Sequence, residues 1–160
     1  MIEKILSGGQ TGVDRGALDA ALDAGVPCGG WCPRGRRAED GRIPARYPLD
    51  ETATPRYVER TRRNVRDSDA TLVLAWGEPS GGTRATVAFA GRMAKPCLVL
   101  DMRKLGDDAA AARAGAWIAA ERVAALNVAG PRASGQPDAR DRARRVVALI
   151  LDNAATPRRS

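Results

Sequence analysis

Ser7-Gly8-Gly9-Gln10-Thr11-Gly12-Val13-Asp14 decides the fold, and it directly follows the short apolar run Ile5-Leu6. Its three glycines predict a tight turn after a strand, because glycine allows positive φ and lets the backbone come close to a ligand. The residues after the turn carry an apolar stripe at helical spacing, so a strand, turn and helix are expected in succession. The start of such a helix offers free N–H groups to an anion, which makes the acid Asp14 conspicuous there.

The composition indicates a globular domain with an aliphatic core. The chain has 160 residues, of which 44% are hydrophobic and 4% aromatic, and this length predicts a single domain. It has no histidine, which excludes a Ser-His-Asp triad, a histidine base and histidine metal ligands. Its three cysteines, without a secretion signal or a membrane span, predict free thiols in a cytoplasmic protein with no membrane partner. The net charge of +7 is mostly arginine, which suits phosphate or carboxylate contacts but does not by itself indicate nucleic acid.

Apolar runs and helical stripes alternate along the chain. Strands are predicted at 2–6, 26–31, 70–76, 96–100 and 125–128, and helices at 11–24, 55–67, 83–94, 107–122 and 138–153. Gly25 is expected to end the first helix. Residues 33–54 form a long polar segment without clear periodicity, which is typical of a functional or mobile loop. The domain is expected to span 1–153, followed by a loose tail at 154–160.

This alternation predicts an α/β fold, namely a Rossmann-like doubly wound parallel sheet of about five strands with helices on both faces. We expect the strand order 2-1-3-4-5, in which the first and third strands are neighbours at the switch point where ligands bind. Both of these strands are followed by glycine loops, Gly8 to Gly12 and Ser80 to Thr83. The sequence therefore predicts one ligand crevice between the two loops.

The two loops differ in charge, which predicts different roles. If Thr11 is the N-cap of the first helix, Asp14 occupies the capping-box position, where a carboxylate satisfies the amides and repels phosphate. The second loop has Thr83 as its expected N-cap and carries no acid in the following turn. We therefore expect phosphate at Gly81-Gly82-Thr83, and a hydroxyl, a ring edge or a metal at Gln10 and Asp14. The sequence leaves open whether Asp14 is a helix cap or a functional group.

Two more segments are expected beside the crevice. The last predicted strand is followed by Asn127-Val128-Ala129-Gly130-Pro131-Arg132, within reach of a nucleotide-sized ligand. In the polar segment, Arg34 is expected to clamp an anion and Trp31 to stack on a ring, with a solvated loop as the alternative. Cys32 is the thiol nearest the crevice, and a buried thiol is its plainer interpretation. The full set of expected binding residues is Gly8, Gly9, Gln10, Thr11, Gly12, Asp14, Arg34, Gly81, Gly82, Thr83, Asn127, Gly130, Arg132 and Ser134, with no metal ligands among them.

Motifs that carry a family resemblance are spread over nearly the whole chain. They are Ser7 to Asp19, Gly30 to Pro33, Ala38 to Gly41, Tyr47-Pro48, Arg60-Thr61, Asn64 to Asp69, Ser80 to Thr83 and Asn127 to Arg132. With them the chain closely resembles the molybdenum carrier family, a circularly permuted, YpsA-like branch of the SLOG superfamily of Rossmann-like proteins. That superfamily includes the LOG phosphoribohydrolases and DNA-processing protein A. The resemblance implies binding of a phosphorylated heterocycle, either the molybdenum cofactor (molybdopterin) or a nucleotide derivative, with Mg²⁺ as a candidate companion ion.

Three functions are compatible with this resemblance. The leading one is a carrier of a phosphorylated small molecule, which we expect to be a homo-oligomer. The second is a nucleotide hydrolase with Asp14 as base or metal ligand. LOG enzymes, however, use a Pro-Gly-Gly-x-Gly-Thr-x-x-Glu motif, and Thr86 stands here in place of its glutamate, which favours a carrier. The third is a single-stranded nucleic-acid binder, which the scarcity of aromatic residues for base stacking disfavours.

Overall fold

The computed structural model describes residues 1–155 and contains a central sheet of five strands. The sheet consists of β1 (Lys4–Leu6), β2 (Cys28–Gly29), β7 (Ala70–Ala75), β8 (Cys97–Asp101) and β9 (Ala125–Ala129), in the order β2-β1-β9-β7-β8. Every pairing between neighbouring strands of this sheet is parallel. The predicted α/β class and the parallel sheet are therefore confirmed.

The predicted strand order is wrong in one respect, the position of the last strand. β9 lies between β1 and β7, whereas the order 2-1-3-4-5 placed it at the edge. Asn127 lies inside the sheet, where it is 3% exposed and its side chain donates to Thr71 Oγ1 on β7 at 3.2 Å. The edge is instead β8, where Val99 is 38% exposed. As a consequence, the loop after β9 rises between the two glycine loops.

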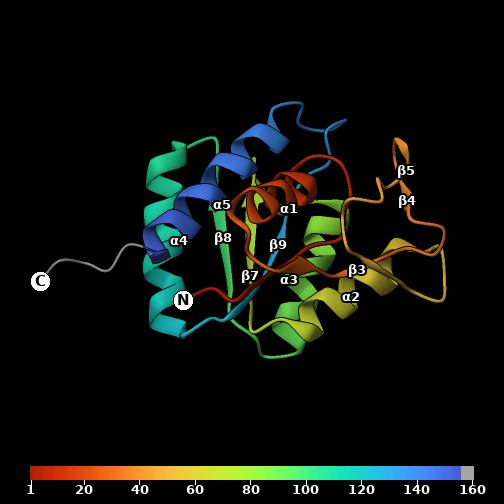
Figure 1. Ribbon diagram of the computed structural model, residues 1–160, viewed down its shortest axis with the longest axis horizontal. Coiled ribbons are helices and arrows are strands. Elements are labelled where there is room, and N and C mark those ends of the chain that lie inside the picture. The colour runs from red at the N-terminus through yellow and green to blue at the C-terminus, as the bar shows by residue number, and fades with distance from the viewer. Residues whose placement is uncertain (156–160) are drawn as a thin grey trace, which may run out of the picture.

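Helices cover both faces of the sheet (Figure 1). On one face α1 (Val13–Ala24) packs against α5 (Ala139–Ala155), and α5 also packs against α4 (Asp107–Glu121). On the other face α2 (Tyr57–Asp67) packs against α3 (Gly81–Arg92). As predicted, α1 ends at Gly25, which adopts the left-handed conformation with φ 67°. The helices predicted from Thr11 and Pro55 begin two residues later than expected, whereas the one predicted from Thr83 begins two residues earlier, at Gly81.

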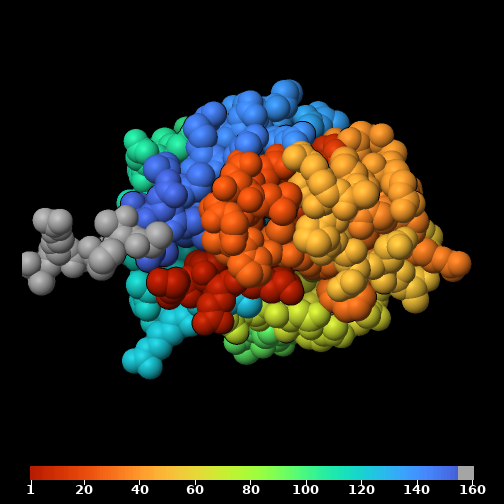
Figure 2. Space-filling model, in the orientation of Figure 1, coloured from red at the N-terminus to blue at the C-terminus, as the bar shows by residue number. Residues whose placement is uncertain are grey.

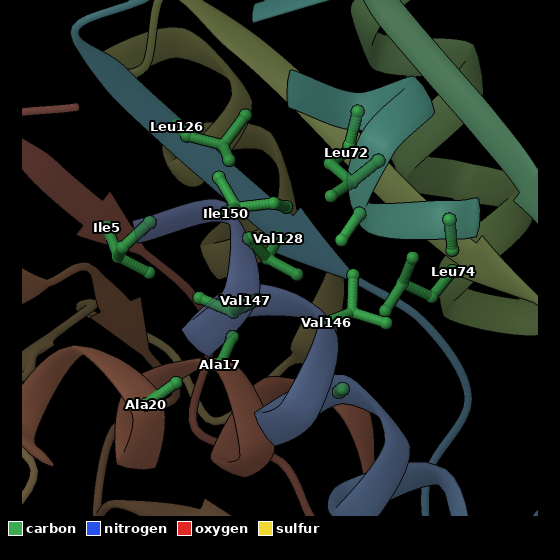
Figure 3. Close-up of a cluster of buried hydrophobic side chains, with 14 of the residues drawn as sticks. Ile5, Ala17, Ala20, Leu72, Leu74, Leu126, Val128, Val146, Val147 and Ile150 are labelled. Carbon is green, nitrogen blue, oxygen red and sulfur yellow. The ribbon is translucent and has the colours of Figure 1, made fainter. Parts of the chain in front are cut away.

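The main core lies between the sheet and the layer of α1 and α5 (Figure 3). It is built mostly from aliphatic side chains, as the composition predicts, and small residues bring the two helices close together. Gly16 of α1 is one such residue, because a Cβ added there would overlap the Arg140 carbonyl oxygen of α5. The labelled core residues in Figure 3 are Ile5, Ala17, Ala20, Leu72, Leu74, Leu126, Val128, Val146, Val147 and Ile150.

The strand predicted at 26–31 is divided into two short strands. β2 belongs to the main sheet, whereas β3 (Trp31–Cys32) leaves it and pairs in parallel with β6 (Asp50–Glu51). The break falls at Gly30, whose φ of 129° disfavours other residues. A Cβ at this position would also overlap the Ser7 carbonyl oxygen. The chain therefore turns away from the sheet at Gly30.

The segment 33–54 is more ordered than its sequence suggests. It contains β6 and an antiparallel hairpin of β4 (Arg37–Ala38) and β5 (Gly41–Arg42), and it covers one end of the molecule (Figure 2). Its apolar side chains form a small core together with residues of α1 and β3, and the members of this core are Leu18, Cys32, Ala38, Ile43, Tyr47 and Leu49. The guanidinium of Arg36 donates to the carbonyl oxygens of Ile43, Pro44, Tyr47 and Leu49 at 2.8 to 3.3 Å. One buried arginine thus replaces the backbone pairing that a longer sheet would supply.

The carboxyl-terminal helix is longer than predicted. α5 continues to Ala155, so residues 154 and 155 belong to the helix and not to the expected tail. The rest of that expected tail, residues 156–160, lies outside the described residues. Within the part of the chain that the structure describes, no helix is both long and apolar enough to span a bilayer.

Candidate functional site

A cavity of about 460 Å³ lies at the carboxyl ends of the three central strands. Its walls come from the loops after β1, β7 and β9, which the parallel sheet brings to one edge, and from the inner side of α2. Ten of the fourteen expected binding residues line it, namely Gly8, Gln10, Asp14, Gly81, Gly82, Thr83, Asn127, Gly130, Arg132 and Ser134. The two glycine loops therefore face one space, as the sequence predicts, with the β9 loop between them.

The loop after β1 is held by β9 on one side and packs against Arg60 of α2 on the other. The Ser7 hydroxyl donates to the Val128 carbonyl oxygen at 2.7 Å and ties the end of β1 to β9. Gly8 lies directly under the Arg60 guanidinium, so closely that a Cβ there would overlap Arg60 Nη1. The absence of a side chain at Gly8 is therefore what admits Arg60 to the cavity wall.

Asp14 is a buried carboxylate in the wall of the cavity, 6% exposed. Its Oδ2 accepts hydrogen bonds from Arg60 Nη1 and from the Gln10 backbone N–H, both at 3.2 Å. Burial raises the pKa of this carboxyl, while the charge of Arg60 and the N–H of Gln10 act to lower it. Asp14 is thus tied both to its own loop and to an arginine of α2.

The expected capping box does not form. α1 begins at Val13 with Gly12 as its N-cap, and Thr11 caps no helix within the described residues. The Thr11 hydroxyl instead donates to Glu39 and accepts the backbone N–H of Ala133 at 3.1 Å. This alternative for Asp14 does not hold because Gly12, with φ 80°, packs against the β9 loop and moves the start of the helix past Thr11.

Four expected binding residues lie outside the lining of the cavity: Gly9, Thr11, Gly12 and Arg34. A Cβ at Gly9 would overlap the Leu49 side chain, and Gly12 would meet the β9 loop in the same way. The smallness of these two glycines therefore serves packing. The Arg34 side chain is exposed, and its backbone N–H donates to the Thr54 carbonyl oxygen at 2.9 Å.

The second loop presents an uncapped helix start. Ser80 is the N-cap of α3, which corrects the expectation for Thr83, and its side chain makes no capping hydrogen bond within the described chain. Gly81, Gly82 and Thr83 form the first three helical positions, whose N–H groups have no partner inside a helix. The first turn carries no acidic residue. Thr86 also lines the cavity, and its hydroxyl donates to the Gly82 carbonyl oxygen at 3.0 Å.

The β9 loop supplies the third wall. Gly130 is required for packing, since a Cβ there would lie 2.5 Å from the Leu74 carbonyl oxygen. Arg132 lies 5.4 Å from the ring centre of Tyr57 and 3.9 Å from the Glu39 carboxylate, a long separation for an ion pair. Ser134 donates from both its N–H and its hydroxyl to Glu39. The tip of the β4–β5 hairpin is in this way bound to the rim of the cavity.

The structure adds residues of α2 that were not among the expected binding residues. Arg60, Thr61 and Asn64 all line the cavity, and the first and third are 9% and 3% exposed. The sequence predicts their helix at 55–67 but gives it no part in the crevice. The signal that could have found them is the resemblance itself, because Arg60-Thr61 and Asn64 stand within its motifs.

Trp31 and Cys32 contact other protein side chains and do not line the cavity. The Trp31 indole N–H donates to Asp67 at 2.7 Å, and Arg63 lies 4.7 Å from its ring centre. Cys32 is fully buried in the smaller core, and burial raises the pKa of its thiol. All three cysteines are described and free, and none is among the residues that line the cavity. Residues 1–155 also hold no cluster of three or more Asp, Glu or Cys side chains that could bind a metal ion.

Two buried donors on the cavity wall have no hydrogen-bond partner. Within the described chain, Gln10 Nε2 and Arg60 Nε are the buried side-chain nitrogen or oxygen atoms in this state. Both residues line the cavity. Because buried polar groups are nearly always paired in folded proteins, these two donors set this wall apart from the rest of the described structure.

These features define a Rossmann-like α/β protein with a polar cavity at the carboxyl ends of its strands. The chain belongs to the circularly permutated YpsA SLOG family, whose model matches residues 5–151. A solved structure from Syntrophus aciditrophicus SB, described as a "putative molybdenum carrier protein", is 43% identical in sequence to this chain, with a TM-score of 0.91. The match covers 94% of this chain and 95% of the chain in that structure. A comparison with curated proteins found no match. The family and the Rossmann-like fold expected from the sequence are therefore confirmed.

Proposed function

We propose that the protein binds a phosphorylated heterocyclic compound, the molybdenum cofactor or a nucleotide derivative, and acts as its carrier. The observation that carries the proposal is the concentration of unpaired buried donors, Gln10 Nε2 and Arg60 Nε, on the wall of one cavity. The name of the solved relative, a molybdenum carrier, supports the choice of ligand class.

The phosphate would bind at the start of α3. The N–H groups of Gly81, Gly82 and Thr83 and the helix dipole favour an anion there, and the first turn has no carboxylate that would repel it. Arg132 lines the same cavity, and its weak pairing with Glu39 leaves it available for a charge-assisted hydrogen bond. The sugar or linker would then pass the β9 loop toward Gln10.

A molybdenum atom in this cavity would be held by its own organic ligand. The lining residues offer N–H donors, hydroxyls and two carboxylates, Asp14 and Glu78, but no thiol, as the structure describes all three cysteines. Such a lining fits the phosphate and the ring of a cofactor. Direct coordination of the metal by the protein is no part of the proposal.

A nucleotide hydrolase is the second candidate, and Asp14 is the observation that favours it. A buried carboxyl with a raised pKa beside a cavity has the character of a general base. Its Oδ2, however, already accepts two hydrogen bonds, and Thr86 occupies the position of the LOG glutamate. Product formation from nucleoside monophosphates that disappears in Asp14→Asn would establish this alternative.

The test is to identify what the protein carries. The protein is purified from cytoplasm without denaturation and examined by native mass spectrometry, with phosphorus and molybdenum measured by elemental analysis. The proposal expects a bound compound that contains phosphorus, with molybdenum in addition if it is the molybdenum cofactor. Protein that carries no such compound, and that shows no calorimetric binding of nucleoside monophosphates, would refute it.

A further inference from the structure

The Gln10 side chain is held in one orientation by two backbone groups. It is 5% exposed, and its Oε1 accepts the N–H of Thr11 at 3.1 Å and the N–H of Glu39 at 2.9 Å. Because both partners are donors, the oxygen of the amide must face them, which assigns Nε2 to the opposite side. Glu39 itself is held by Thr11 and Ser134, so the hairpin tip fixes this orientation.

The unpaired groups on this wall are all donors. Gln10 Nε2 and Arg60 Nε both carry N–H hydrogens and lack an acceptor within residues 1–155. The two residues are linked through Asp14, whose Oδ2 accepts from the Gln10 backbone and from Arg60. A buried donor without a partner costs about 1–3 kcal/mol. An acceptor from the ligand would remove this cost.

From its position, Gln10 would contact the ring of a ligand whose phosphate lies at the start of α3. β9 separates β1 from β7, so the loops that follow β1 and β7 are two strand spacings apart, roughly 9.5 Å. A single phosphate does not reach across this distance, whereas a nucleotide does. The loop after β1 therefore meets the end of the ligand opposite its phosphate.

We propose that Gln10 selects ligands whose heterocycle carries an exocyclic oxo group and disfavours those with an amino group at the same place. The inference rests on the proposed function and refines its ligand class. An oxo oxygen has two lone pairs and accepts a hydrogen bond from Nε2. An amino group at the same place would point its own hydrogens at the Nε2–H groups, and two donors that face each other form no hydrogen bond. The Thr11 and Glu39 backbone groups are what prevent the amide from turning over.

Inosine monophosphate and adenosine monophosphate are the probes, because their purines differ at position 6 by this exchange of oxo for amino, together with the hydrogen that inosine carries on N1. Isothermal titration of the full chain is expected to show inosine monophosphate binding at least about tenfold more tightly. In Gln10→Glu the second carboxylate oxygen replaces Nε2, so the preference is expected to reverse in favour of adenosine monophosphate. Asn153→Asp is the control, since it makes the same charge change at an exposed position of α5 outside the cavity lining and is expected to leave the ratio of the two affinities unchanged.

The outcomes separate the inference from the proposed function. Equal binding of both nucleotides by the wild-type protein, or an unchanged preference in a folded Gln10→Glu variant, would overturn the inference and leave the proposed function standing. If neither nucleotide nor inorganic phosphate binds at millimolar concentration and the purified protein carries no phosphorus-containing compound, the proposed function fails and the inference with it. Should Gln10→Glu not fold, as judged by its circular dichroism and melting curve, the ratio measured for the wild-type protein alone decides.

Discussion

Replacing Thr83 by aspartate is predicted to stabilise the protein and at the same time to weaken phosphate binding. Thr83 is the third residue of α3, whose first turn carries no acid and whose N-cap side chain makes no capping hydrogen bond within the described chain. A carboxylate at this position satisfies the free N–H groups and interacts favourably with the helix dipole. It then occupies, with its own negative charge, the place that the phosphate would take.

The two effects have opposite signs and different sizes. The added helix–charge interaction stabilises by about 0.3–1 kcal/mol, which raises Tm by about 1–4 °C in a domain of this size. Loss of two charge-assisted hydrogen bonds to a phosphate, at about 1.5–3 kcal/mol each, weakens binding by roughly 10²–10⁴-fold. Because the variant is more stable, its loss of affinity cannot be attributed to unfolding.

The assay combines thermal unfolding with calorimetric titration of inosine monophosphate and adenosine monophosphate. Thr83→Asn is the matched control, because it has the size and capping ability of aspartate without the charge. We expect it to bind whichever nucleotide binds more tightly within a few-fold of the wild-type affinity. If Thr83→Asp shows the higher Tm but still binds that nucleotide within about threefold of wild type, the phosphate does not lie on α3 and the assignment of the two loops is refuted.

Three further predictions concern the elements that shape the cavity. Arg36→Met removes the side-chain donor of four backbone carbonyl oxygens, of which those of Pro44 and Tyr47 keep a backbone N–H partner. The expected cost is about 3 kcal/mol, with faster amide exchange confined to 36–49, and unchanged exchange there would contradict the role of Arg36. The hydrogen bond from Arg103 is the main cause that lowers the pKa of Asp101 to about 2. The stabilising effect of this carboxylate is therefore present above pH 4 and lost as pH falls toward 2. The Tm difference between wild type and Asp101→Asn should shrink over this range, and a constant difference would contradict the lowered pKa. In Gly30→Ala the new Cβ would overlap the Ser7 carbonyl oxygen at a φ of 129°, so the free energy of unfolding measured in urea is expected to fall by more than about 2 kcal/mol. Gly115→Ala is the contrasting variant, because no heavy atom of the described chain lies near its new Cβ. It should stabilise α4 by up to about 1 kcal/mol.

The fold class could be predicted from the sequence because its signals are local. The apolar run at 70–76, the glycine turns after it and after Leu6, and the helical stripes that follow each specify their own element without reference to the rest of the chain. Strand order is different, because it depends on which neighbours a strand finds in space. Asn127 illustrates this, since its amide is polar in the sequence but paired with Thr71 in the middle of the sheet.

The same distinction explains which parts of the site could be predicted. The glycine loops are continuous in sequence, so Gln10 and Thr83 could be placed beside one crevice before the structure was known. Apart from the motifs of the resemblance, nothing in the sequence marks Arg60, because its position depends on Gly8 leaving room for its guanidinium and on Asp14 pairing with it. These contacts join residues about fifty positions apart, and no local pattern marks them.

Asp14 connects the structural and the functional interpretation of the opening loop. Its Oδ2 takes the Gln10 backbone N–H and the Arg60 guanidinium together, so the carboxylate holds the Gln10 backbone and the Arg60 side chain, the two residues that carry the unpaired Nε2 and Nε donors. A catalytic base must direct a lone pair at its substrate and change its protonation during turnover. A carboxylate that neutralises a buried arginine loses this pairing when it is protonated, and breaking a buried ion pair is costly. We therefore infer that Asp14 positions the donors of a binding site, and that the opening loop serves to hold a ligand more than to transform it.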